Sequence, residues 1–132
     1  TEIVQTLLDH GANPNIQNNI GGTALMYTSY WGYPHILQTL LAHGADPNGQ
    51  DGHGNTALLL AGMEGHAEIV RILLKTGADP YMPHHNGNNA LDVDQTGVIQ
   101  DWLDRQSVQA GMRDYLGQPS ESDANTDAAP NL

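Results

Sequence analysis

Apolar side chains in the middle of this chain recur with the spacing of one helical face. They occupy positions i, i+1, i+4 and i+5 in the segments 36–41 and 69–74, and the second segment begins 33 positions after the first. In an α-helix these four positions share one side. Each segment therefore predicts a helix that buries one face and exposes the other. The buried positions are Ile36, Leu37, Leu40 and Leu41 in the first segment, and Ile69, Val70, Leu73 and Leu74 in the second.

The same step along the chain returns in two other sequence markers. A Leu-Leu-x-x-Gly-Ala-Asp/Asn-Pro segment begins at Leu7, Leu40 and Leu73. A three-residue segment that ends in Ala-Leu begins at Thr23, Thr56 and Asn89. Two independent markers with one period indicate an array of stacked repeats, in which each unit buries its apolar face against its neighbours. Such an array offers an extended surface and seldom an enclosed pocket.

The residues between these markers predict what one unit contains. A hairpin with Gly precedes a first helix, whose opening Thr or Asn has a side-chain oxygen that accepts from free amide groups. The first helices present Leu25, Thr28, Leu58 and Ala61 to the stack. Gly32 and Gly65 then allow the left-handed turn into the second helix. We place a half unit at residues 1–17, full units at 18–50 and 51–83, and a shortened capping unit at 84–116.

The sequence of the units resembles the ankyrin repeat. The segment from Gly65 to Leu74, Gly-His-Ala-Glu-Ile-Val-Arg-Ile-Leu-Leu, and the three Gly-Ala-Asp/Asn-Pro segments carry the resemblance, which covers residues 1 to about 104. It implies a mainly α solenoid of helix-turn-helix units joined by hairpin loops. It also implies a non-catalytic module that binds a partner protein through its concave face and hairpin tips.

This chain departs from the family pattern where a Pro-Leu-His segment is usual. Ala24-Leu25-Met26 and Ala57-Leu58-Leu59 stand there, so the His that bonds across units in the family is absent. The resemblance therefore does not imply the family's usual ladder of hydrogen bonds between units for this chain. We expect the apolar Met26 and Leu59 to pack on each other instead.

The last unit departs from the period. Val98 aligns with Ile69, which lies 29 positions before it instead of 33, so about one helical turn is missing between Leu91 and Val98. Asp92, Asp94 and Gln95 occupy places that are apolar or small in an internal unit, which is typical of a capping repeat. We expect a further short helix at 105–116. The polar segment 117–132 has little to bury and predicts a disordered acidic tail.

Charge narrows the classes of partner. The 132 residues contain 15 Asp and Glu against 4 Lys and Arg, which gives a formal net charge of −11. This field repels a phosphate backbone and an anionic membrane surface, so we expect neither nucleic acid nor membrane as a partner. The absence of Cys excludes disulfides and thiol catalysis. We expect a monomer in the cytoplasm. Because Thr1 lies inside a repeat, we expect either a fragment or a natural chain that continues upstream.

Catalytic and metal-binding motifs are the alternatives to a binding module. The chain has no Gly-rich phosphate loop, nucleophile elbow or His-Glu-x-x-His helix, so we expect no enzyme and no cofactor. His53, His84 and His85 lie with Asp51 on neighbouring hairpins, where a surface metal site is the alternative to ordinary solvated loop residues. We expect no metal there. A second alternative is the regulatory or targeting repeat region of a larger enzyme whose catalytic domain lies outside this fragment.

The predicted binding surface follows the hairpin tips and the exposed side of the first helices. Tyr30 and Trp31 are its most informative members, because the core needs no aromatic residues there and because Trp and Tyr are enriched at interface hot spots. Packing against Tyr33 or Met63 is the alternative role for both rings. The partner-binding candidates are Ile20, Tyr27, Tyr30, Trp31, His53, Asn55, Met63, Glu64, His85 and Asn86. The same surface includes Asn19, Gly22, Gly52, Leu60 and Asn88.

Overall fold

The structure is a computed structural model that describes the backbone of residues 2–117 and the side chains of residues 2–111. The chain divides into two compact units, residues 1–100 and residues 101–132. The predicted acidic tail, residues 117–132, lies outside the described residues apart from Gly117. The predicted capping unit, 84–116, contains the division between the two compact units, and its extent stays a prediction.

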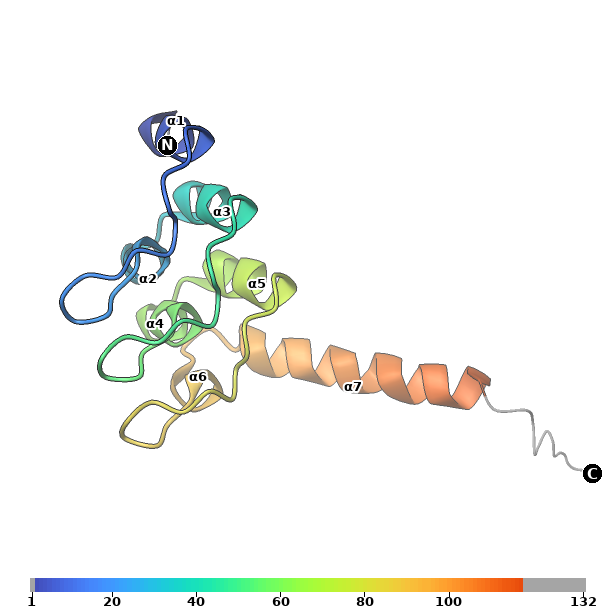
Figure 1. Ribbon diagram of the computed structural model, residues 1–132. Helices are drawn as coiled ribbons and strands as arrows, with labels where there is room; N and C mark the ends of the chain where they lie inside the picture. Colours follow the sequence, from blue (N-terminus) through green and yellow to red (C-terminus); the bar gives the residue numbers. More distant parts are fainter. Residues whose placement is uncertain (1, 118–132) are drawn as a thin grey trace, which may run out of the picture. The chain divides into compact units, whose positions relative to one another are not determined.

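Helices make up all the regular secondary structure in the described part of the chain, as a helical solenoid requires. A single helix, α1 (Glu2–Asp9), precedes the pair α2 (Ala24–Trp31) and α3 (Pro34–Ala42) and the pair α4 (Ala57–Glu64) and α5 (Ala67–Lys75). The short α6 (Ala90–Val93) and α7 (Val98–Gly117) follow. In Figure 1, α2, α4 and α6 form one row and α1, α3 and α5 a second, with the hairpin loops extending from the side of the first row. The predicted solenoid is confirmed.

The first helix of each full unit begins and ends at the predicted residues. Thr23 accepts a hydrogen bond from the amide of Met26 at 3.3 Å, and Thr56 accepts from the amide of Leu59 at 3.1 Å. These bonds satisfy amides that have no partner within the helix. A glycine with positive φ ends each helix and turns the chain into its antiparallel partner.

The core lies between the two rows of helices, where neighbouring units meet. The four residues predicted to face the stack from the first helices are all buried. From the second helices, α5 buries all four predicted residues, whereas α3 buries Leu37 and Leu40 and leaves Ile36 and Leu41 half-buried. Met26 and Leu59 are buried too. The apolar face of each unit is therefore covered by the next unit rather than by its own helices alone.

Asparagine side chains supply hydrogen bonds between successive units. Asn15 donates from Nδ2 to the carbonyl oxygen of Gly44 at 3.0 Å, and its Oδ1 accepts from the amide of Asp46 at 2.7 Å. Asn48 makes the same two bonds, at 3.0 and 2.7 Å, to the equivalent residues one unit further on. This Asn ladder connects the loops that follow the second helices, so an inter-unit ladder exists without the family His.

The last unit differs from the two full units in its helices. Its first helix, α6, has 4 residues where α2 and α4 have 8 each. Asn89 and Asp92 form a reciprocal capping box on α6, and the Asp94 carboxylate accepts from the amides of Thr96 and Ile99 at the start of α7. The polar residues of this unit therefore cap helix ends. The prediction of a further short helix at 105–116 was wrong, because these residues belong to α7, which runs unbroken from Val98 to Gly117.

A side-chain contact at His43 attaches α1 to α3. The Nε2 atom of His43 lies 3.0 Å from Oδ1 of Asp9, and Nδ1 lies 2.9 Å from the carbonyl oxygen of Thr39. Both partners are acceptors, so both ring nitrogens donate only in the protonated imidazolium. The bonds to Thr39 and Asp9 raise the pKa of His43, and the bonds from His43 and Gln5 lower the pKa of Asp9.

The attachment of α1 is expected to weaken as the pH rises above neutrality. The raised pKa of His43 contributes stability that is complete below its ordinary value of 6.5 and is lost as the pH rises through the folded-state value. The lowered pKa of Asp9 contributes stability that is complete above its ordinary value of 3.8 and is lost as the pH falls through the folded-state value. Amide-exchange protection of α1 relative to α5 should therefore be greatest between about pH 4 and pH 6.5.

The chain offers a matched control for this prediction. Thr76 stands in the next unit where His43 stands here, and its hydroxyl bonds to the carbonyl oxygen of Leu73. His43→Thr should abolish the pH dependence of α1 protection and leave α5 unchanged. A wild-type ratio that stays constant from about pH 5 to pH 8.5 would contradict the role given to the His43–Asp9 contact.

Candidate functional site

Three hairpin tips stand beside one another along the row of first helices. Each tip is closed by a hydrogen bond from the amide of its first residue to the carbonyl oxygen four residues later, at 2.9 Å in 18–22, 3.0 Å in 51–55 and 2.7 Å in 84–88. Adjacent tips are joined through their backbones, because Gly52 donates to Ile20 at 2.7 Å and His85 donates to His53 at 3.1 Å. The tips therefore form a connected edge beside α2, α4 and α6.

The first side chain of each of the two leading hairpins organises its own tip. Asn18 accepts through Oδ1 from the amides of Ile20 and Gly22, at 3.1 and 2.8 Å. Asp51, at the equivalent position of the next hairpin, accepts through Oδ1 from the amides of His53 and Asn55, both at 2.9 Å. An amide oxygen and a carboxylate oxygen thus hold the same turn.

The carboxylate of Asp51 is held in its ionised form. Partial burial pushes its pKa upward, but the bond from the Asn55 side chain and the amides of Asn55 and His53 together outweigh this effect. The pKa of Asp51 therefore lies below its ordinary value.

The outward face of α2 carries three aromatic side chains. Tyr27, Tyr30 and Trp31 are 45%, 38% and 63% exposed, while the opposite side of the same helix is filled by buried residues. The rings of Tyr30 and Trp31 pack edge to face, with centroids 5.0 Å apart and planes at 87°. The hydroxyl of Tyr27 accepts from Nδ2 of Asn18 at 2.6 Å. These contacts order the rings while their outer surfaces stay open.

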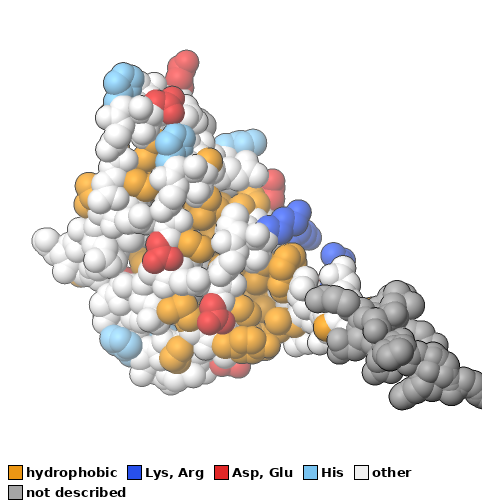
Figure 2. Space-filling view, turned by 45° about the vertical axis from the view of Figure 1, so that its right-hand side comes forward, with side chains coloured by type: hydrophobic (Ala, Val, Ile, Leu, Met, Phe, Trp, Pro, Cys, Tyr) orange, Lys and Arg blue, Asp and Glu red, His pale blue; other side chains and the backbone are white. Residues whose placement is uncertain are grey.

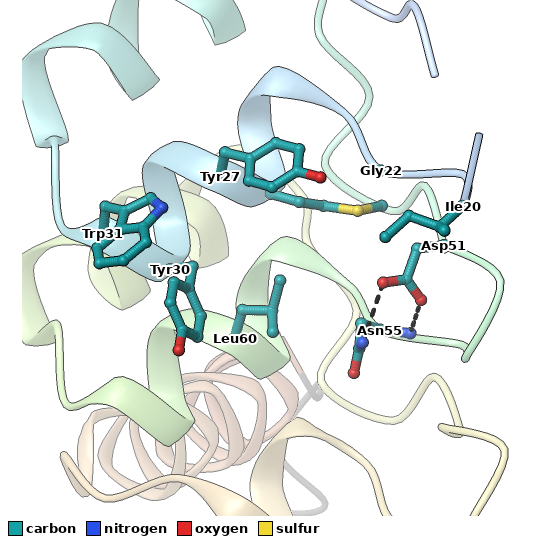
Figure 3. Close-up of a pocket in the computed structure, with 9 residues that line it drawn as sticks. Ile20, Gly22, Tyr27, Tyr30, Trp31, Asp51, Asn55 and Leu60 are labelled. Carbon is teal, nitrogen blue, oxygen red and sulfur yellow. Dashed lines mark hydrogen bonds between the residues drawn. The ribbon is translucent and has the colours of Figure 1, made fainter. Parts of the chain in front are cut away.

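Together with the hairpins and α4, these aromatics enclose an open hollow of about 230 Å³. Figure 3 shows Trp31 and Tyr30 at one end, Asp51 and Asn55 at the other, and Leu60 between them. Most of the lining is apolar, with polar groups at the end formed by the second hairpin. The lining residues are Ile20, Gly22, Met26, Tyr27, Tyr30, Trp31, Asp51, Asn55 and Leu60. We refer to this feature below as the aromatic hollow.

The end of α2 is fixed to the next unit by His66. The ring donates from Nε2 to the carbonyl oxygen of Tyr30 at 3.0 Å. It lies directly against Gly32, where an added Cβ would come within 2.7 Å of the ring. Gly32 also has φ of +83°, so this position requires glycine for conformation and for space. The backbone that carries Tyr30 and Trp31 is thereby held in place.

The structure brings together half of the predicted partner-binding residues. Ile20, Tyr27, Tyr30, Trp31 and Asn55 line the aromatic hollow. Among the described residues, the ring contact of Trp31 is with Tyr30 and not with Tyr33, which was one of its two predicted alternative neighbours beside Met63.

The other five predicted residues lie outside the hollow. Met63 and Glu64 are exposed at the end of α4, while His53, His85 and Asn86 are exposed on the hairpin tips. Two lining residues were missed, Met26 and Asp51. Alignment of the repeats could have identified Asp51, because it stands at the position that Asn18 occupies in the preceding hairpin.

The first helices and hairpins that form and flank the aromatic hollow contain no Lys or Arg. The four Lys and Arg residues lie at positions 71, 75, 105 and 113, and none falls within 18–31, 51–64 or 84–93. Figure 2 shows acidic side chains scattered among hydrophobic and uncharged ones, with Lys and Arg side chains gathered at one side of the face that it presents. The hollow itself has a mainly apolar lining, in which Asp51 is the charged residue.

The hairpin histidines do not converge. The rings of His84 and His85 have centroids 6.3 Å apart, and no group of three or more His, Cys, Asp or Glu side chains able to hold a metal occurs in the described part of the chain. Ser29 is buried, and its hydroxyl donates to the carbonyl oxygen of Leu25 at 2.7 Å. The geometry around the hollow suits contact with another molecule's surface.

Comparison with known proteins identifies the family of this repeat array. The model of the family described as ankyrin repeats (3 copies) matches residues 1–84. This range includes α1 to α5 and every residue that lines the hollow. No curated protein matches the chain. None of the helices in the described residues combines the length and the apolar character that crossing a bilayer requires.

Replacing Gly32 by Ala is expected to destabilise the array more than replacing Gly65, its counterpart in the next unit. Both glycines have positive φ, so each variant should lose about 1 kcal/mol from backbone strain. Only at Gly32 must the His66 ring move and give up its bond to Tyr30, which costs about 1 kcal/mol more. Urea unfolding followed by Trp fluorescence measures the difference. Equal losses would show that His66 does not fix the end of α2.

Proposed function

Because the chain belongs to the ankyrin-repeat family, we propose that it is a non-catalytic module that holds a partner protein on the aromatic hollow and the adjoining hairpin tips. Ankyrin repeats are generally protein–protein interaction modules. The observation that carries the proposal is the cluster of Tyr27, Tyr30 and Trp31, which line an apolar hollow and stay largely exposed. The surface is open, as an extended partner requires.

Stability of the fold does not account for these aromatic rings. The stack-facing side of α2 is already filled, by Leu25, Thr28 and Ser29, whose exposed fractions are 8% or less. Trp31, with 63% of its surface in contact with water, contributes little to this core. Large, rigid aromatic side chains bury much area at a small entropic cost when a partner covers them. Their place and order are therefore suited to an interface.

The charge of the site favours a protein over the other classes of macromolecule. The formal charge of −11 opposes a phosphate backbone, and none of the residues that line the hollow is Lys or Arg to offset it. An anionic lipid surface meets the same repulsion. A protein segment needs no such compensation and fits the apolar lining.

Trp31→Ala is expected to remove most of the binding and little of the stability. The probes are peptides selected on the wild-type chain from a randomised display library, then synthesised and measured by isothermal titration calorimetry. Loss of a hot-spot Trp should weaken their binding by about 2 kcal/mol, close to 30-fold. The midpoint of urea unfolding should move by less than about 0.5 kcal/mol in stability.

Tyr33→Ala is the matched control. Tyr33 is an exposed aromatic residue next to α2 that does not line the hollow, so its removal should leave peptide affinity within about twofold of the wild type. The proposal would be contradicted if no peptide binds the wild-type chain, or if the two variants lose the same affinity.

A further inference from the structure

The charge of Asp51 is not required by the turn that it holds. Asn18 occupies the equivalent position one unit earlier and accepts the same pair of backbone amides through Oδ1. Asp51 makes the equivalent two bonds at 2.9 Å with one carboxylate oxygen, and its other oxygen accepts from Nδ2 of Asn55 at 3.0 Å. Asn18 shows that a neutral amide oxygen is enough for the two backbone bonds. The backbone of the turn therefore does not require the negative charge of Asp51.

Asp51 lies where a charge acts on anything that enters the aromatic hollow. It lines the hollow, half-buried, at the end opposite Trp31, with Ile20 next to it and Leu60 between the two ends (Figure 3). Asn18, in contrast, does not line the hollow and instead holds the hydroxyl of Tyr27. Of these two equivalent side chains, only the one that carries a carboxylate therefore lines the hollow.

Among the described residues, no ion pair joins Asp51 to a Lys or Arg. The ion pair of His43 with Asp9 lies on a different pair of helices. The hydrogen bonds to Asp51 come from neutral groups, namely the Asn55 amide side chain and the backbone amides of Asn55 and His53. An ionised carboxylate beside an apolar surface gains most from a cation that arrives with the partner.

We propose, as an extension of the function proposed above, that the aromatic hollow takes a partner-protein segment in which a large apolar side chain stands next to a Lys or Arg. The apolar side chain packs against Tyr27, Tyr30 and Leu60. The aliphatic stem of the Lys or Arg follows the apolar lining, and its cationic head pairs with Asp51. The net charge of −11 on the whole chain attracts such a cationic segment.

Other cations fit this place less well. A divalent metal ion requires several oxygen or nitrogen ligands, and no group of three or more His, Cys, Asp or Glu side chains able to hold one occurs in the described part of the chain. A free small amine can pair with Asp51 or lie on the aromatic rings, but it leaves the rest of the apolar lining uncovered. A segment with both apolar and cationic side chains uses the whole length of the hollow.

The test compares two substitutions that remove one negative charge each. Asp51→Asn installs the residue found at position 18, and the control Asp79→Asn installs the residue found at position 13, where an amide oxygen makes the same type of turn bond as Asp79. Each substitution therefore keeps an amide oxygen where the chain elsewhere uses one for the same backbone bonds, and Asp51→Asn also changes the contact with the Asn55 side chain. A randomised heptapeptide display library is selected separately on the wild-type chain and on both variants.

Peptides selected on the wild type and on Asp79→Asn should be enriched in Lys or Arg next to Leu, Phe or Trp. Peptides selected on Asp51→Asn should be enriched in the apolar residue without the basic one. Synthesised wild-type binders should lose about three- to fivefold in affinity on Asp51→Asn and less than about 1.5-fold on Asp79→Asn. Replacing their Lys or Arg by Gln should cost the same factor on the wild type and nothing on Asp51→Asn.

Two failures can be told apart. If the selected peptides depend on Trp31 but show no preference for Lys or Arg, or if Asp51→Asn and Asp79→Asn weaken them equally, the assignment to Asp51 is wrong and the interaction module stands. If no selected peptide depends on Trp31, the proposed function fails, and this inference fails with it. Equal circular dichroism and unfolding midpoints of the variants confirm that all comparisons are made on folded protein.

Discussion

The burial of each repeat against the next is the constraint on which the rest of this structure depends. A pair of helices with 8 or 9 residues each cannot enclose its own apolar face, so α4 packs against α2 and α6, and α5 packs against α3. The Asn15 and Asn48 bonds and the backbone bonds between hairpin tips keep neighbouring units in one register. Stability and spacing therefore come from the same contacts.

This register also creates the candidate site. The aromatic hollow takes residues from two successive units, and neither unit forms it alone. Backbone bonding between Gly52 and Ile20 brings the second hairpin against the first, and His66 holds the end of α2 from the following unit. The side chains that face a partner are thus positioned by the stacking that folds the array. A local loss of stacking between these two units is therefore expected to separate the residues that line the hollow.

Much of the fold was predictable because the constant period of the repeats fixes which positions are equivalent. The capping role of Thr23 and Thr56 and the buried faces of the helices follow from local spacing, and the structure agrees with them. The continuity of α7 was not predictable, since polar residues such as Asp104 and Arg105 look the same in an exposed helix and in a break.

The site was predictable only in part, for a different reason. Tyr30 and Trp31 stand out in the sequence because no core position needs them, and both line the hollow. Whether Met63 or Asp51 lines it as well depends on how one unit is rotated against the next, and the sequence period carries no information on that angle. Comparison of Asp51 with Asn18 in the aligned repeats is the signal that would have drawn attention to the second hairpin.

The central claim is that partners bind on the row of first helices and hairpin tips. Amide chemical shifts of the ¹⁵N-labelled chain, recorded while the tightest library-selected peptide is added, test it most directly. The account predicts that the largest shifts fall in residues 18–31 and 51–60, which contain every residue that lines the hollow. Shifts centred on α3 and α5, with residues 18–31 unaffected, would contradict it.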